Sequence, residues 1–156
     1  MTALGVLFLA AGPATGQTRE TLEPDGTYMF AGRDTCELYM DIYEPAAGSE
    51  TVYMGKEKPS VLFVFGGGFI AGRRDEPFHL PWYKALTEKG YRVIAIDYRL
   101  GLKGAKSVGI AQVNLLDKAI HMAVEDLFSA TSFIIDNAEA LDIDPYNIVL
   151  CGSSPG

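Results

Sequence analysis

The chain ends in a serine, held in a glycine-flanked turn, that could serve as a nucleophile. Gly152-Ser153-Ser154-Pro155-Gly156 has the form G-x-S-x-G with Ser154 at its centre. The apolar run before it, residues 148–151, predicts a strand buried on both faces of a parallel sheet. A serine in a sharp turn after such a strand is exposed at the carboxyl end of the sheet, where its hydroxyl can attack a carbonyl carbon. The competing interpretation is an ordinary Gly/Ser/Pro turn.

A second glycine motif follows another apolar run, residues 61–65. Gly66-Gly67-Gly68 could bring backbone N–H groups close to a substrate oxygen, because glycine carries no side chain to keep them apart. Its competing interpretation is purely structural, a place where the chain crosses a helix.

The same glycines also fit a different chemistry. Gly66-x-Gly68-x-x-Ala71 matches the dinucleotide-binding fingerprint, and Asp97 could serve as its ribose-binding acid. That fingerprint must open a helix at once, to aim the helix N-terminus at the pyrophosphate. Residues 72–77 are a poor helix start, and absence of a helix within residues 69–77 would exclude a dinucleotide-binding domain.

Alternating strands and helices must position these motifs. The pattern predicts a hairpin of residues 28–30 and 38–43, a loop at 45–58, strands at 61–65, 91–96 and 148–151, and helices at 81–89 and 115–140. This order is typical of an α/β domain over residues 27–156, with a mostly parallel sheet and an antiparallel N-terminal hairpin. Ligands of such sheets bind at the carboxyl ends of the strands, where both glycine motifs lie.

The long second helix carries an apolar face. Spacings of three, four or seven predict that the following residues pack on the sheet: Ile120, Val124, Leu127, Ile134, Ala138 and Leu141. Glu125 and Asp126 are expected on the solvated side.

Composition narrows the function classes. The chain has 156 residues, 48% of them hydrophobic, and a net charge of −7 with scattered basic residues, which argues against a nucleic-acid partner. No apolar run reaches the roughly 18 residues that span a bilayer. The two cysteines and two histidines have no zinc spacing, so we expect no metal and no disulfide framework.

The N-terminus resembles a secretory signal peptide, residues 1–16. An apolar stretch is followed by Ala14-Thr15-Gly16, small residues suited to cleavage before Gln17, although no Lys or Arg precedes the stretch. We expect a secreted or periplasmic protein. It would be cytoplasmic if this segment is only a mildly apolar N-terminus.

Three motifs together resemble the α/β-hydrolase fold, in its carboxylesterase and hormone-sensitive-lipase-like branch: residues 65–69, 97–100 and 152–156. The resemblance implies a carboxylic ester hydrolase that needs no cofactor and acts on a small-molecule ester, with acyl groups on carbohydrates among the candidates. It assigns Ser154 as the nucleophile, Gly67 and Gly68 as oxyanion-hole donors, and Phe69 as part of the substrate pocket. Asp97 to Arg99 would be structural. The family usually has histidine where Phe65 stands, so one polar support of the glycine loop is lost.

In this family the catalytic acid and histidine follow the nucleophile. His79 and His121 precede Ser154, so we expect both to be non-catalytic. The resemblance therefore predicts the N-terminal half of a longer hydrolase, truncated after the nucleophile strand and inactive alone. A non-catalytic binding domain is the remaining alternative.

Overall fold

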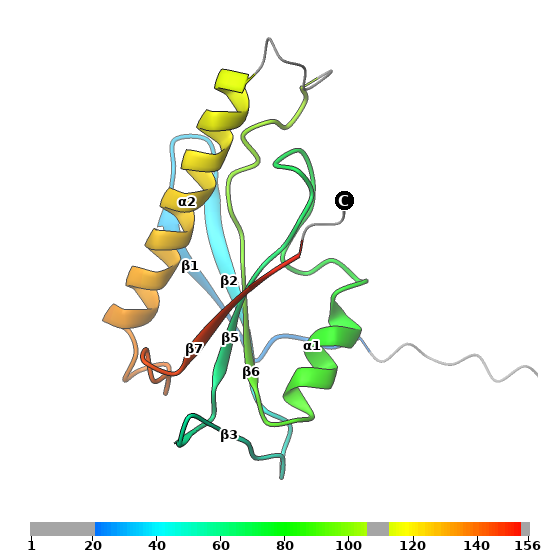
Figure 1. Cartoon of the computed structure of the whole chain (residues 1–156), viewed down its shortest axis with the longest axis vertical. Coiled ribbons are helices and arrows are strands. Elements are labelled where there is room, and N and C mark those ends of the chain that lie inside the picture. The colour runs from blue at the N-terminus through cyan, green and yellow to red at the C-terminus, as the bar shows by residue number, and fades with distance from the viewer. Residues whose placement is uncertain (1–20, 106–112, 154–156) are drawn as a thin grey trace, which may run out of the picture.

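Five apolar runs pair into one mixed β-sheet with a helix on each face (Figure 1). The computed structural model describes residues 21–105 and 113–153. The elements are β1 (Gly26–Gly32), β2 (Glu37–Tyr43), β3 (Val52–Tyr53), β4 (Lys56–Glu57), β5 (Ser60–Val64), α1 (Leu80–Thr87), β6 (Arg92–Ile96), α2 (Val113–Asp136) and β7 (Ile148–Gly152). The main sheet has the order β1-β2-β6-β5-β7, and β3 and β4 form a separate small hairpin within the predicted loop.

The pairing confirms the predicted fold class. β1 and β2 form the antiparallel hairpin, and β2 pairs antiparallel with β6. β5 lies parallel to both β6 and β7, so the carboxyl ends of these three strands meet at one edge of the sheet. The predicted signal peptide and residues 154–156 lie outside the described residues.

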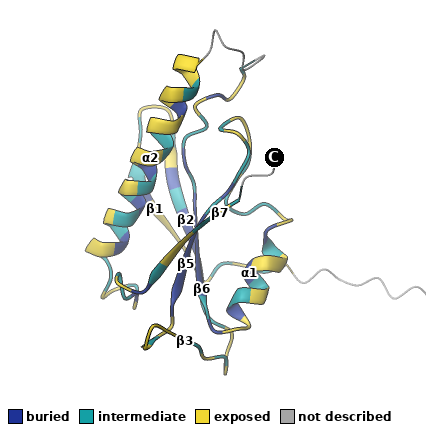
Figure 2. Ribbon diagram, viewed as in Figure 1, coloured by how far each residue is buried: buried dark blue, intermediate teal, exposed yellow. Residues whose placement is uncertain are grey.

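The two faces of the sheet carry separate cores. One cluster lies under α2 and includes Met40, Ile94 and Ile134, all fully buried. The other lies under α1 and includes Phe63 and Tyr83. Every residue of the central strand β6 is buried, as Figure 2 shows, which is expected of a strand covered on both faces.

The sequence correctly predicts α1. Pro81 lies in its first turn, where a missing N–H costs nothing. The helix ends before Gly90, whose φ of 86° reverses the chain into β6. None of the helices in the described part of the chain is long and apolar enough to cross a membrane.

Two burial predictions are wrong. β7 was expected to be buried on both faces, but Val149 and Leu150 are exposed. The reason is its position: β7 is the edge strand of the described sheet and pairs only with β5.

The face that α2 turns to the sheet also differs from the prediction. Ile134 is buried as expected, but Ile120 and Val124 are exposed, and the other buried residues are Ala119, Asp126 and Ala130. Small alanines allow a close approach: a Cβ on Gly101 would lie 2.7 Å from the Cβ of Ala119.

Candidate active site

The two glycine motifs touch each other at the carboxyl ends of β5 and β7. Val64 and Gly152 are register partners in the parallel pair. The N–H of Ser153 donates to the Val64 carbonyl at 3.1 Å, and the N–H of Gly66 donates to Ser153 Oγ at 3.0 Å. The proposed nucleophile Ser154 comes directly after this contact and, like Pro155, lies outside the described residues.

The glycine loop needs glycine for a steric reason. Gly67 has φ 141° and Gly68 has φ 60°, both in the region that side chains disfavour. A Cβ on Gly67 would lie 1.9 Å from the carbonyl oxygen of Ala71. The Gly67 carbonyl accepts N–H bonds from Ile70 at 3.0 Å and Ala71 at 3.3 Å, which closes the loop on itself.

The N–H groups of Gly67 and Gly68 have no hydrogen-bond acceptor within the described residues. Unused N–H groups on a tightly closed loop are suited to bind a developing oxyanion. The geometry of both residues is therefore compatible with the donor role expected from sequence.

Phe69 points into the protein rather than standing free. It is half-buried with φ 62°, and its ring meets Tyr98 edge-on at 6.1 Å between centroids. Its carbonyl accepts the N–H of Leu102 at 2.9 Å. In the described residues Phe69 thus fixes the middle of the loop to the segment after β6.

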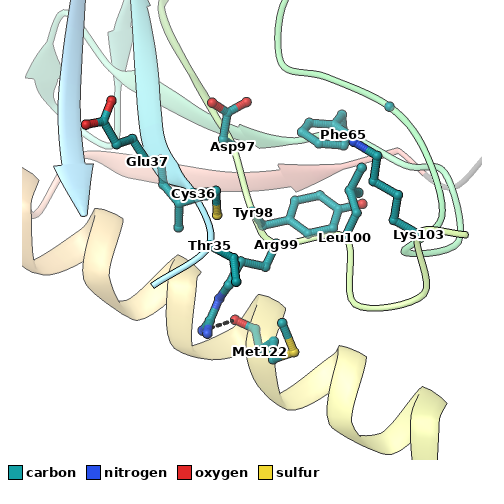
Figure 3. Close-up of a pocket in the computed structure, with 12 residues that line it drawn as sticks. Thr35, Cys36, Glu37, Phe65, Asp97, Tyr98, Arg99, Leu100, Lys103 and Met122 are labelled. Carbon is teal, nitrogen blue, oxygen red and sulfur yellow. Dashed lines mark hydrogen bonds between the residues drawn. The ribbon is translucent and has the colours of Figure 1, made fainter. Parts of the chain in front are cut away.

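A cavity of about 480 Å³ lies between the β1–β2 turn and the end of β6 (Figure 3). Phe65 and Tyr98 stack in its wall with centroids 4.5 Å apart. Gly67, Gly68 and Phe69 are absent from its lining. This cavity is therefore separate from the N–H donors of the loop.

The segment after β6 has the structural role that was expected of it. Asp97 accepts a hydrogen bond from Arg74 at 2.6 Å and one from the N–H of Tyr39 at 3.3 Å. Burial raises the pKa of the Asp97 carboxyl, and the neighbouring Arg74 opposes that rise.

Asp126 was expected on a solvated face and is fully buried instead. Its carboxylate accepts hydrogen bonds from Arg33 at 3.0 and 3.1 Å and from Arg99 at 2.9 and 3.0 Å. Arg99 also pairs with Glu125. Two arginines from the sheet side thus compensate the buried charge, a long-range pairing that helical periodicity cannot reveal.

The two histidines lie in unlike places. His79 is buried at the start of α1, with its ring packed against Phe63 and Phe78, and burial lowers its pKa. His121 is exposed on α2, where Nδ1 lies 2.8 Å from the Asp117 carbonyl oxygen. That neither is catalytic stays a prediction from their positions before Ser154 in the sequence.

The described residues support neither a dinucleotide-binding site nor a metal site. No helix begins within residues 69–77, and α1 starts only at Leu80, so the dinucleotide-binding interpretation is excluded. Among the residues that the structure describes, no group of three or more His, Cys, Asp or Glu could hold a metal ion. Cys36 and Cys151 are free thiols.

The chain matches a family model and a solved esterase structure. The sequence model of the BD-FAE family matches residues 40–156. The propionate-bound structure of the thermophilic esterase Est2 from Thermogutta terrifontis is 26% identical, with a TM-score of 0.59, and the match covers 83% of this chain and 41% of that one.

Curated relatives are longer. Juvenile hormone esterase of Tribolium castaneum is 29% identical over 80% of this chain and 19% of its own length. Neuroligin-like protein glit-1 of Caenorhabditis elegans is 27% identical over 85% of this chain and 16% of its own length. The chain therefore spans less than a quarter of either relative.

Proposed function

The chain belongs to the BD-FAE family of α/β-hydrolase esterases, and from this membership we propose that it carries the nucleophile and the oxyanion-binding loop of a serine carboxylic ester hydrolase. The observation that carries the proposal is the hydrogen bond from the Gly66 N–H to Ser153 Oγ. It joins the loop that bears the N–H groups of Gly67 and Gly68 to Ser153, the residue directly before Ser154 in the sequence. The proposed substrate is a small-molecule carboxylic ester, with acyl groups on carbohydrates as one candidate class.

In the proposed reaction, the Ser154 hydroxyl oxygen attacks the ester carbonyl carbon. The carbonyl electron pair moves onto its oxygen, and the N–H groups of Gly67 and Gly68 stabilise that oxyanion. Collapse of the tetrahedral intermediate expels the alcohol and leaves an acyl group on Ser154, which water then removes. Because both donors are backbone groups on a closed loop, little reorganisation is needed as charge develops.

The reaction also needs a base for the serine proton and an acid to orient that base. We propose that a histidine and a carboxylate after Ser154 supply them, in the part of the fold that the solved esterase has and this chain does not cover. Phe69 is proposed to shape the inner wall of the acyl or alcohol pocket. We further propose export after cleavage before Gln17, which mass spectrometry of culture or periplasmic fractions can check.

A chimera tests this function. Residues 27–156 replace the matching segment of the Thermogutta terrifontis esterase, and hydrolysis of p-nitrophenyl butyrate and of acetylated xylan is measured. We expect turnover that Ser154→Ala abolishes and labelling of Ser154 by a fluorophosphonate. Ser132→Ala, at an exposed position on α2, serves as the matched control and should leave activity unchanged. Turnover that persists in Ser154→Ala would show that another residue is the nucleophile.

A further inference from the structure

Arg74 joins the end of the glycine loop to two strands of the sheet. Its Nη1 donates to Asp97 Oδ2 at 2.6 Å, at the carboxyl end of β6. Its Nε lies 2.8 Å from Asp41 Oδ2 on β2, a charge contact that lacks hydrogen-bond geometry. The side chain of Arg74 is only 19% exposed, so the pairs are largely shielded from water.

Each partner of Arg74 is itself held in place. The other oxygen of Asp41, whose side chain is buried in β2, accepts a hydrogen bond from Thr27 Oγ1 at 2.6 Å. The Tyr83 hydroxyl on α1 donates to the Arg74 carbonyl at 2.8 Å. The end of the loop is thereby tied to β1, β2, β6 and α1 through one residue.

The charge balance makes Arg74 hard to replace. Asp41 and Asp97 both face its guanidinium, and without that cation the buried carboxylate of Asp41 and the half-buried carboxylate of Asp97 would repel each other. An uncharged residue would remove the bridge and also add repulsion at the base of the loop.

The chain between Gly68 and Arg74 folds back onto the start of the loop. Gly72 has φ 114°, and a Cβ there would lie 2.6 Å from the Phe65 ring and 2.7 Å from the Gly66 carbonyl oxygen. The end of the loop thus rests directly on its beginning, and we expect a displacement at Arg74 to reach the donor residues.

From these contacts we propose that Arg74 is a positioning residue, which holds the N–H groups of Gly67 and Gly68 in place by clamping the loop to Asp41 and Asp97. The inference rests on the proposed oxyanion-hole function of those N–H groups. Arg73 provides a built-in control, because its side chain is 61% exposed and pairs only with nearby Asp75 among the described residues.

Hydrogen–deuterium exchange on the chain itself tests the clamp without any catalysis. Arg74→Gln should accelerate exchange of the Ile70 and Ala71 amides about tenfold or more, whereas Arg73→Gln should not. Arg74→Lys should restore part of the protection, because a lysine keeps the charge but lacks the forked donor. If Arg74→Gln does not fold, Arg74→Lys and Asp97→Asn are compared with Arg73→Gln in the same way. Unchanged exchange in every folded variant overturns the clamp.

The chimera described above tests the consequence for catalysis. Arg74→Gln should lower kcat about 10- to 100-fold while KM for p-nitrophenyl butyrate stays within about twofold, and Arg74→Lys should recover part of the loss. An active chimera in which Arg74→Gln and Arg73→Gln have equal kcat overturns the positioning role. An inactive unsubstituted chimera together with faster exchange in Arg74→Gln counts against the proposed function and supports the clamp.

Discussion

Pro155 follows the proposed nucleophile directly, and proline has no backbone N–H. In the α/β-hydrolase family that the sequence resembles, the backbone N–H of the residue after the nucleophile is a third oxyanion donor. With proline there, this chain would keep only the donors of Gly67 and Gly68. Losing one such donor typically costs about 10²–10³ in rate. We therefore expect Pro155→Ala to raise the kcat of the chimera about tenfold or more, as measured with p-nitrophenyl butyrate. Equal kcat values would show that the third donor is not the residue after Ser154.

A methyl group added at Gly67 would clash with the loop, whereas one added at Gly68 would meet open space. Alanine substitutions at the two positions therefore separate the steric need for glycine from the backbone preference for it. Gly68 has open space around its missing Cβ, so Gly68→Ala should cost only the left-handed backbone penalty of about 1–2 kcal/mol. Gly67→Ala must also displace the Ala71 carbonyl and should cost about 3 kcal/mol. Urea unfolding of both variants compares the two free energies, and an equal loss would mean that the loop closes less tightly than described.

At the scale of the element, Asp126 fixes the position of α2. Its side chain is fully buried and holds Arg33 and Arg99, so Asp126→Asn removes the buried counter-charge that the two arginines share and leaves Arg99 with the exposed Glu125. We expect this change to lower the free energy of unfolding by about 3 kcal/mol. Asp117→Asn on the exposed side of the same helix should change it by less than about 0.5 kcal/mol. Urea denaturation monitored by circular dichroism measures both, and equal effects would argue against an anchoring role for Asp126.

Periodicity predicted α2 and part of its contact with the sheet, because Ile134 is buried and Leu127 and Leu141 pack against the same core. Ile120 and Val124 were also predicted to pack but are exposed, whereas Ala119 and Ala130 were not predicted and are buried. Their small size permits the close approach, and the ion pairs of Asp126 fix the rotation of the helix. Neither effect is encoded in the helical spacing of apolar residues, because each depends on groups far away in the sequence.

At the scale of the whole molecule, the parallel pairing of the strands and the meeting of the two glycine motifs follow from sequence. Alternating elements imply parallel strands, and parallel strands bring their carboxyl ends to one edge. The supports of the loop could not be predicted, because Ser153 and Arg74 act through partners on other strands. The resemblance suggested that Phe65 costs the loop a polar support. The structure has one at Ser153 Oγ, which accepts the Gly66 N–H.

The open side of the sheet predicts how residues 1–156 behave on their own. Within the described part of the chain β7 pairs on one side only, and Val149 and Leu150 on it are exposed, as is Phe128 on α2. An unpaired apolar edge strand is a template for association, so we expect oligomers or aggregates in size-exclusion chromatography with light scattering. Leu150→Lys should shift the population toward monomer, because a charge on an edge strand opposes pairing. Val52→Lys, an exposed apolar position on the β3–β4 hairpin, should not shift the population.

Residues 1–156 on their own should also hydrolyse p-nitrophenyl acetate no faster than background, since a serine without a general base is a weak nucleophile. A monodisperse monomer whose esterase activity disappears in Ser154→Ala would contradict both expectations and would place the catalytic base within these residues.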